Sequence, residues 1–413
     1  MEKRKLYLFT DSFPYSKYRE DSFLSFEIIA LAKYFDLTII PSCTEGEIAE
    51  TPEIKIETNF ANCLKAITKK HLIKRVFIAI TSVLFLKEIC GNIKNILSLY
   101  KLKLLLTEAY NIHVIHKWLE SYLKKNNVSE AVLYTYWLST KTLGLALLKK
   151  NNKKIKVISR AHRIDLYEEL SKFLPFRKTT LNYIDRLYLI SDNGYNYITK
   201  KYPEVIKKCE VSKLGVKKTE FLSYGSKDGI FRIVSCSAII PVKRIKLIAE
   251  SLVYLASELN NMYFEWYHIG EGELKSEVEE YLTNNKKSNL KFKFLGFLKN
   301  EEVFNFYKST PIDVLINVSS SEGVPVSIME AQSCGIPTIA TDVGGSSEIV
   351  NSNNGILLSS NPDKIEIAEA VKYLINNKNI VAKMQKSSFE NWENNYNAEI
   401  NYDNFAESIF NLK

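Results

Sequence analysis

The stretch Ser319-Ser-Ser-Glu322-Gly-Val-Pro325-Val-Ser-Ile-Met-Glu330-Ala-Gln-Ser-Cys-Gly-Ile-Pro337 carries the signals of one strand–loop–helix unit. It follows the apolar run Val314–Asn317, which predicts a buried strand. Pro325 suits the first turn of a helix, and Cys334-Gly335 with Pro337 just beyond suits its end. The stretch therefore predicts a loop that leaves a strand and opens a helix, the unit from which parallel α/β sheets are built.

This unit also holds two carboxylates, Glu322 on the loop and Glu330 eight residues later inside the helix. The first turn of a helix leaves its backbone N–H groups without partners inside the helix, so Gly323 and Val324, beside Pro325, form a candidate anion site. Carboxylates next to such a site are natural partners for sugar and ribose hydroxyls.

Outward from this unit, short β-rich runs alternate with longer amphipathic segments along almost the whole chain. This alternation predicts βα units and a mainly parallel, doubly wound sheet. The expected strands are Leu6–Phe9, Leu37–Ile40, Ala131–Tyr134, Ile155–Ser159, Leu187–Ile190, Phe231–Ser235, Tyr263–Ile269, Val314–Asn317, Thr338–Ala340 and Ile356–Leu358.

The alternation pauses in a polar, Gly-containing link at Ser223–Gly229. Two α/β domains are expected, spanning residues 1–225 and 226–395, with residues 396–413 forming a C-terminal helix that packs on the first. Ligands of such folds bind at the carboxyl ends of the strands, here in the cleft between the domains. The length of 413 residues is compatible with two or three domains.

The net charge of +9 is unevenly distributed. Residues 1–225 contain 38 basic and 23 acidic side chains, a net of +15, whereas residues 226–413 contain 18 and 24, a net of −6. A basic first half indicates an anionic partner, unless it reflects a simple bias toward lysine. The overall composition, 46% hydrophobic and 25% charged, is that of a folded globular chain and argues against disorder.

Part of the positive charge lies in the helix-like region 62–105, which interleaves apolar residues with nine basic residues and one acid, Glu88. Such helices suit the surface of an anionic membrane. The alternative is a solvated helix face packed on its own domain. No nucleic-acid motif accompanies the charge, so no nucleic-acid partner is expected. The basic residues are Lys65, Lys69, Lys70, Lys74, Arg75, Lys87, Lys94, Lys101 and Lys103.

No export signal or membrane span is expected. The apolar stretch Leu6–Phe9 is too short for the core of a signal peptide. The longest apolar run, between Arg75 and Lys87, falls far below the ~20 residues of a spanning helix. The six cysteines form no C-x-x-C pair, and the five histidines are scattered, so no zinc site is expected. These features predict a cytoplasmic protein, with peripheral contact to the inner face of the plasma membrane as a further expectation.

The full motif context identifies a resemblance. The E-x7-E pair of Glu322 and Glu330 stands with G-V-P, with G-I-P-T at 335–338 and with T-D-V-G-G-S-S-E at 341–348. This combination resembles family 4 of the glycosyltransferases. The resemblance implies a retaining, nucleotide-sugar-dependent enzyme with two Rossmann-like domains facing across a cleft, the GT-B architecture. It also implies that the C-terminal helix crosses back to the first domain.

The resemblance implies roles for residues on the donor side. Glu322 holds the hydroxyls of the transferred sugar, and Glu330 holds the ribose. Lys243, with Arg244 beside it, contacts the donor pyrophosphate. The arginine that many members carry five residues earlier is Ala238 here, so phosphate binding leans on Lys243, Arg244 and backbone N–H groups. Gly270 belongs to a strand-end turn, and Phe297 belongs to the loop 294–297 that lies against the nucleotide base; a core strand end is the alternative for Phe297.

On the acceptor side, the resemblance places His162 against the transferred sugar near the reacting centre, with Asp165 orienting its loop. Tyr136 and Trp137 line the acceptor side, or alternatively serve packing. The first loop holds Lys17 and Arg19 where many members have a glycine pair, which points to an anionic acceptor.

The implied reaction moves a sugar from a nucleotide diphosphate to a hydroxyl of a glycan or lipid-linked acceptor, in surface polysaccharide or lipopolysaccharide synthesis. Asp-x-Asp occurs nowhere in the chain, so neither a metal nor another cofactor is expected. Two alternatives are a nucleotide-sugar 2-epimerase, since the 2-epimerases share the architecture, and a non-catalytic sugar-nucleotide-binding protein.

Overall fold

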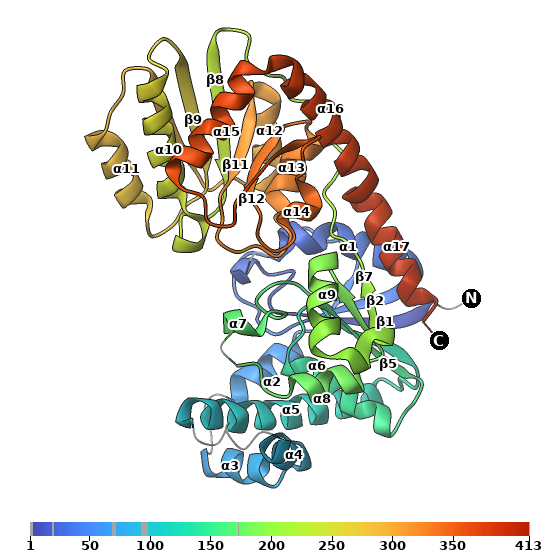
Figure 1. The fold of residues 1–413 in the computed structure, drawn as a ribbon. Helices are drawn as coiled ribbons and strands as arrows, with labels where there is room; N and C mark the ends of the chain where they lie inside the picture. Colours follow the sequence, from blue (N-terminus) through green and yellow to red (C-terminus); the bar gives the residue numbers. More distant parts are fainter. Residues whose placement is uncertain (1–2, 19, 68–71, 92–97, 172, 413) are drawn as a thin grey trace. The chain divides into compact units, whose positions relative to one another are not determined.

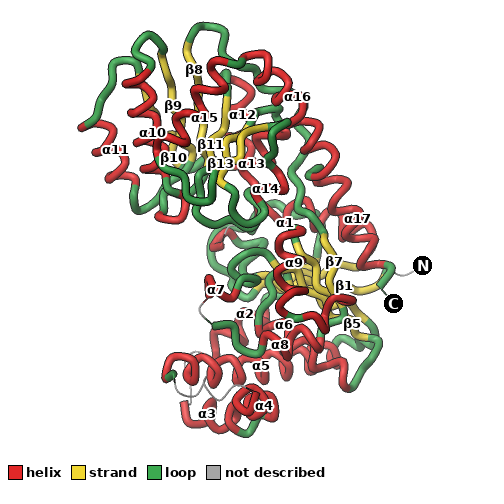
Figure 2. Tube along the Cα trace, viewed as in Figure 1, coloured by secondary structure: helices red, strands yellow, loops and turns green. Residues whose placement is uncertain are grey.

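The computed structural model describes residues 3–18, 20–67, 72–91, 98–171 and 173–412 and contains two parallel β-sheets, each flanked by helices (Figures 1 and 2). The chain divides into two compact units, Met1–Ser212 with Tyr402–Lys413, and Lys213–Asn401. The residue 225 at which the sequence suggests a cut falls inside the second unit. The expected α/β fold with two parallel sheets is confirmed.

The first unit is built on a seven-stranded sheet with the order β3-β2-β1-β4-β5-β6-β7. Each pairing between these strands is parallel. The order reverses between β1 and β4, so the loops after these two strands diverge and leave a crevice at the carboxyl edge. The strands are β1 Arg4–Thr10, β2 Phe35–Pro41, β3 Lys55–Ile56, β4 Ala131–Thr135, β5 Ile155–Ala161, β6 Arg186–Leu189 and β7 Cys209–Val211.

Helices cover this sheet because its strands are apolar on both faces and must be buried on both. Two short helices, α3 and α4, do not touch the sheet but pack on α5, which lies between them and the rest of the unit (Figure 1). The helices are α1 Asp21–Tyr34, α2 Asn59–Ile67, α3 Leu72–Ile80, α4 Val83–Gly91, α5 Leu99–Lys125, α6 Thr140–Ala146, α7 Glu168–Ser171, α8 Arg177–Tyr183 and α9 Asp192–Lys201.

The second unit has a six-stranded parallel sheet with the order β10-β9-β8-β11-β12-β13, the strand order of a dinucleotide-binding fold. Its reversal lies between β8 and β11. The edge strand β10 alternates Lys and Phe, which explains why it does not read as a buried strand in the sequence. The strands are β8 Ile230–Cys236, β9 Tyr263–Ile269, β10 Leu290–Gly296, β11 Val314–Asn317, β12 Thr338–Thr341 and β13 Gly355–Leu358.

The core of the second unit lies between its sheet and the flanking helices, with Trp266 as its largest buried side chain. The helices are α10 Ile245–Glu258, α11 Lys275–Asn284, α12 Asn300–Ser309, α13 Val326–Ser333, α14 Ser346–Ile349, α15 Lys364–Asn376 and α16 Lys378–Asn395. The last helix, α17 Ala398–Phe410, belongs to the first unit from Tyr402 onward.

The C-terminal part of α17 is fixed to the first sheet through a buried ion pair. Arg160 of β5 pairs with Glu27 of α1, and neither side chain is exposed to solvent. Phe405 of α17 lies with its ring 4.1 Å from the Arg160 guanidinium, and Tyr134 donates a hydrogen bond to Glu27 at 2.7 Å. Because removing one partner would leave a buried charge uncompensated, this cluster holds α1, β5 and α17 together.

Candidate donor and acceptor sites

The donor-side residues meet at the carboxyl edge of the second sheet, where the strand order reverses. The loop after β8 carries Lys243, and the loop after β11 carries Glu322. The Nζ of Lys243 lies 2.5 Å from Oε1 of Glu322, and Asn317 Nδ2 donates to the same oxygen at 3.4 Å. Glu322 is only 7% exposed. Two residues 79 positions apart in the sequence therefore form one charged pair at the switch point.

Backbone contacts lock this loop to its neighbours. Ser320 N donates to Val242 O at 2.8 Å, and Gly345 N donates to Gly323 O at 2.7 Å. Gly344 has a φ of 57°, and a Cβ added there would lie 1.9 Å from the carbonyl oxygen of Glu322. A glycine is thus required at position 344, because the backbone of that loop lies directly on the Glu322 loop.

The start of α13 presents unpaired backbone donors. Pro325 precedes the helix without capping it through a side chain. Within the described ranges, no protein acceptor lies against the N–H groups of Gly323 or Val324. Val324 and Pro325 are buried, so the two amides stand beside Glu322 in a site that is largely shielded from solvent. This is the arrangement that the sequence predicts for an anion at a helix N-terminus.

Arg244 adds a second cation beside Lys243. Its backbone lies in the left-handed region, with a φ of 51°, just before α10 begins. Its Nη2 donates to Ser360 O at 3.2 Å, while its buried Nη1 finds no hydrogen-bond partner among the residues that the structure describes. Burial lowers the pKa of Arg244 from its usual value. A buried guanidinium nitrogen without a partner suits an anionic ligand.

Glu330 lies on α13 and is 7% exposed. Burial raises the pKa of its carboxyl to about 7, and the hydrogen bond that Asn300 Nδ2 donates to Oε1 at 2.5 Å acts in the opposite direction. Asn300, the first residue of α12, is a site residue that the sequence reading missed. No signal in the sequence marks it, because only the tertiary structure brings the start of α12 to Glu330 of α13.

The other two predicted donor residues lie at the ends of β9 and β10. Gly270 adopts a φ of 138° and donates from its backbone to Gly296 O at 2.8 Å. A Cβ on Gly270 would lie 1.9 Å from Ser237 O, so this glycine lets the β8 and β9 loops approach each other. Phe297 is 51% exposed rather than part of the core, which leaves its ring accessible to a ligand.

In the first unit, His162 follows β5, and its ring packs against two neighbouring aromatic rings. Its ring centroid is 4.5 Å from that of Tyr136 and 4.4 Å from that of Trp137. Its backbone N–H donates to Asp165 Oδ1 at 2.8 Å, and its Nδ1 lies 3.6 Å from Asp165 Oδ2. The Nε2 atom is buried and has no hydrogen-bond partner within the described parts of the chain. The Asp165 carboxylate therefore holds the backbone of the loop that carries His162.

Glu20 fixes this arrangement from the β1 side and was not assigned a role from the sequence. The carboxylate is 1% exposed and accepts hydrogen bonds from Ser12 N at 2.6 Å, Phe13 N at 2.8 Å and Trp137 Nε1 at 2.6 Å. It thereby holds both the loop after β1 and the indole that packs against His162. The sequence offers no signal for this, since Glu20 and Trp137 are 117 residues apart.

The remaining acceptor-side residues are placed as follows. Tyr136 is fully buried, and its ring packs on His162. Lys17 is exposed and pairs with Glu45, with 2.5 Å between Nζ and Oε2. Arg19 lies outside the described residues.

A mainly apolar cavity of about 510 Å³ opens at the same edge of the first sheet, and we call it the α5 cavity. Trp137 and Asp165 line it, together with residues of α5, of the β4–α6 turn and of the segment that leads into α8. It is lined by Asp11, Tyr18, Glu20, Leu104, Glu108, Trp137, Leu138, Ser139, Thr140, Ile164, Asp165, Ser171, Phe173, Leu174, Pro175, Arg177 and Thr180.

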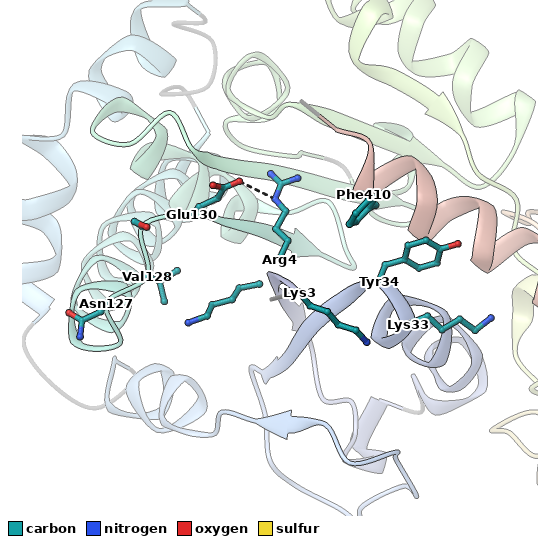
Figure 3. Close-up of a pocket in the computed structure, with 10 residues that line it drawn as sticks. Lys3, Arg4, Lys33, Tyr34, Asn127, Val128, Glu130 and Phe410 are labelled. Atoms are coloured by element: carbon teal, nitrogen blue, oxygen red, sulfur yellow. Dashed lines mark ion pairs between the residues drawn. The ribbon is translucent and has the colours of Figure 1, made fainter. Parts of the chain in front are cut away.

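A second cavity, of about 810 Å³, lies at the opposite, amino-terminal ends of β1 and β4. Lys3, Arg4 and Lys33 line it, and Figure 3 shows Arg4 directed toward Glu130, with 3.6 Å between Nε and Oε1. Ligands of parallel α/β sheets bind at the carboxyl ends of the strands, so this cavity has no place in the predicted chemistry.

Two further observations concern metals and membranes. Among the described residues, no group of three or more His, Cys, Asp or Glu side chains is arranged to hold a metal ion. In the same part of the chain, none of the helices combines the length and apolar character that crossing a bilayer requires. Lys69, Lys70 and Lys94 of the basic region lie outside the described residues.

Comparison with known proteins agrees with this geometry. Residues 216–391, which contain all the donor-side residues, match the family model described as glycosyl transferases group 1. A GtfA subunit of a UDP-N-acetylglucosamine–peptide N-acetylglucosaminyltransferase from Streptococcus agalactiae is 29% identical over 165 residues, which are 38% of this chain and 31% of that protein. An Escherichia coli UDP-Gal:α-D-GlcNAc-diphosphoundecaprenol α-1,3-galactosyltransferase is 28% identical over 186 residues, which are 43% of each. The chain thus spans less than half the length of both.

The solved structure of the lipopolysaccharide outer core galactosyltransferase WaaB superimposes over 98% of this chain and 99% of that one, with a TM-score of 0.69 and 16% identity. At that identity the likeness shows the fold alone. It agrees with the two parallel sheets described above. Residues 216–391 of this chain therefore resemble the glycosyl transferases group 1 family, and the chain has a two-domain α/β fold of the GT-B type.

Proposed function

We propose that this chain is a retaining glycosyltransferase of family 4, which moves a sugar from a nucleoside diphosphate to a hydroxyl of a glycan or lipid-linked acceptor in surface polysaccharide or lipopolysaccharide synthesis. The observation that carries the proposal is the contact between Lys243 and Glu322 at the switch point, beside the unpaired amides of Gly323 and Val324. The name of the E. coli relative, a galactosyltransferase for a diphosphoundecaprenol-linked sugar, supports a lipid-linked acceptor.

The charges at this site suit departure of a nucleoside diphosphate. As the bond between the anomeric carbon and the phosphate oxygen breaks, negative charge grows on the diphosphate and positive charge on the sugar ring. Lys243, Arg244 and the amides at the start of α13 stabilise the diphosphate, and such preorganised groups contribute several kcal/mol in a shielded site. Glu322 accepts hydrogen bonds from the sugar hydroxyls, and Glu330 accepts them from the ribose.

The same proposal covers the stereochemistry and the cofactor requirement. The acceptor oxygen attacks on the face that the diphosphate leaves, so the anomeric configuration is retained, and the acceptor's proton passes to the leaving phosphate. His162 contacts the transferred sugar. The reaction uses no metal, since positive side chains and backbone amides take the place of a cation at the diphosphate. The support for retention is the resemblance to family 4, and the support for Lys243 as the cation is its position beside Glu322.

A donor and product assay tests the proposed function. The full chain is screened for thermal stabilisation by nucleotide sugars, and the stabilising donor is then incubated with acceptor glycosides, with and without EDTA. We expect nucleoside diphosphate release that depends on acceptor and persists in EDTA, and a product whose anomeric configuration, read by NMR, matches the donor's. Conversion of the donor to an epimer without acceptor, or nucleotide-sugar binding without any transfer, would overturn the proposal.

We further propose that the chain works at the cytoplasmic, inner face of the plasma membrane, in peripheral contact with anionic lipid through the helices of region 62–105. The support is the exposed apolar surface of α3, α4 and the start of α5, where Phe77 is 64% exposed and Leu99 is 86% exposed. Lys87, Lys101 and Lys103 lie in the same helices. Each cation near an anionic surface contributes about 1 kcal/mol.

A further inference from the structure

The α5 cavity opens beside His162 but is not used by any step of the donor chemistry. Trp137 lines the cavity and also packs against the His162 ring, with 4.4 Å between ring centroids. A ligand in the cavity is thus separated from the His162 ring by a single indole. Its volume, about 510 Å³, lies within the range of about 300–1,000 Å³ that is usual for small-molecule sites.

The charged groups of the cavity are already engaged by the protein. Both oxygens of Asp165 accept backbone hydrogen bonds, from His162 at 2.8 Å and from Leu138 at 2.9 Å. Glu108 accepts from the hydroxyl of Thr140, and the buried guanidinium of Arg177 donates to the carbonyl of Asp165. A bare sugar needs several free hydrogen-bonding partners. These side chains leave few free donors or acceptors, because they already form hydrogen bonds to other groups of the cavity wall.

The surface that remains for a ligand is apolar. Ile164 is 64% exposed, and Leu104, Leu174 and Pro175 are half-buried around the cavity. An apolar wall of this kind binds hydrocarbon by removing it from water, at about 25 cal/mol per Å² buried. The cavity therefore presents an apolar wall to a ligand whose polar end reaches toward Trp137 and His162.

The apolar wall is held in place by α4 and α5. Glu88 of α4 accepts a hydrogen bond from the backbone N–H of Phe176 at 3.1 Å, and Phe176 itself is fully buried. Lys101 of α5 lies with its ammonium 5.1 Å from the centre of the Phe173 ring. The helices that carry the exposed apolar surface thus also fix one wall of the cavity.

From this arrangement we infer that the α5 cavity binds the apolar aglycone of an amphipathic acceptor, so that the acceptor is a lipid-linked sugar rather than a free glycan. The inference rests on the proposed function and adds to it the chemical class of the acceptor. An aliphatic chain lies along Ile164 and Leu174, and the sugar that it carries lies at the Trp137 end of the cavity.

Paired acceptors test the inference. The full chain is assayed with its donor and either a free sugar or the octyl glycoside of the same sugar, below the critical micelle concentration. We expect kcat/KM to be at least tenfold higher for the octyl glycoside. Leu174→Asp should lower the ratio of the two kcat/KM values toward one. If Leu174→Asp fails to fold, Ile164→Asp, at a more exposed position of the same cavity, should lower the ratio in the same way. The matched control is Leu170→Asp on α7, since Leu170 is 42% exposed and does not line the cavity; it keeps the preference.

Equal kcat/KM for the two acceptors in the wild type would overturn the inference, and so would a loss of preference in Leu170→Asp. Binding separates this failure from failure of the proposed function. Tryptophan fluorescence is titrated with the octyl glycoside without donor, in the wild type and in Leu174→Asp. Saturable binding that Leu174→Asp weakens at least tenfold, without transfer to any acceptor, leaves the cavity assignment standing and overturns the transferase proposal. Transfer without such binding overturns the cavity assignment alone.

Discussion

Lys243 and Glu322 form a direct ion pair, with 2.5 Å between Nζ and Oε1, at the point where the strand order of the second sheet reverses. In the absence of a ligand each side chain neutralises the other. Under the proposed function, a bound diphosphate would give Lys243 a second anionic partner and would leave Glu322 able to accept a hydrogen bond from a sugar hydroxyl. We therefore expect the pair to couple the phosphate end of the donor to its sugar end.

Removing Lys243 should remove charge stabilisation from the leaving diphosphate. We expect Lys243→Ala to lower kcat/KM by about 10²–10³-fold, the size of effect seen when one preorganised electrostatic group is lost. Steady-state assays with the donor from the screen measure this. Lys246→Ala is the matched control, because Lys246 lies three residues on, is exposed, and pairs with Glu277 at 2.6 Å. An equal effect in both variants would contradict the assignment of Lys243.

Glu330 should make the stability of the free protein depend on pH. Its pKa is about 7 in the folded chain because of burial, against a usual value of 4.5. The folded state therefore holds this proton to a higher pH than the unfolded state does. The contribution of the protonated Glu330 carboxyl to the free energy of unfolding is therefore fully present below pH 4.5, and it is lost as the pH rises through about 7. Glu330→Gln should flatten this part of the Tm–pH curve, and Glu301→Gln, at an exposed position on α12, should not.

The glycine after β12 should be sensitive to any side chain. Gly344→Ala should destabilise the fold for two reasons: the residue has a positive φ, and its added Cβ would lie 1.9 Å from the carbonyl oxygen of Glu322. Only the first reason applies to Gly229→Ala, since Gly229 has a φ of 83° and no atom lies within 4 Å of its added Cβ. Urea unfolding should give a loss of about 1 kcal/mol for Gly229→Ala, the cost of a left-handed side chain, and a clearly larger loss for Gly344→Ala. Equal losses would mean that the loop contact contributes nothing.

Glu20 should couple the stability of the loop after β1 to that of Trp137, which packs against His162. Glu20→Ala leaves buried donors of Ser12, Phe13 and Trp137 unpaired, which costs about 1–3 kcal/mol for each unsatisfied group. Trp137→Phe removes one of these donors while keeping an aromatic ring. A double-mutant cycle in urea unfolding should therefore give a coupling energy above about 0.5 kcal/mol between the two positions. Additive losses would show that the hydrogen bond to the indole does not matter.

Membrane contact should depend on both salt and apolar side chains. The wild type should float with anionic vesicles at low ionic strength and dissociate as salt rises. Phe77→Ser with Leu86→Ser should weaken flotation through lost apolar contact, and Lys101→Glu with Lys103→Glu through lost attraction. Ile206→Ser is the control, since Ile206 is also exposed but lies outside these helices. Flotation of the wild type that is equal with neutral and anionic vesicles would refute the electrostatic part.

The sequence by itself determined the class of fold, and it located two of the loops that form the candidate donor site, with their charged residues. The strands Tyr263–Ile269 and Val314–Asn317 were predicted at their observed bounds, because both are short runs rich in aromatic or β-branched residues between turn residues. Strand β10 was missed because it lies at a sheet edge and alternates Lys with Phe. Motif spacing located Glu322, Glu330 and Lys243 because a strand–loop–helix unit fixes which residues follow the strand.

Only the tertiary structure decided which of these residues touch. The contact between Lys243 and Glu322 depends on β8 and β11 being neighbours in the sheet. The local sequence of neither strand predicts that strand order. Asn300 and Glu20 entered the sites for the same reason, since each meets a partner from a distant part of the chain. Local sequence sets strands, turns and helix starts through backbone preference and burial, whereas contacts between distant loops follow from how the sheet orders its strands.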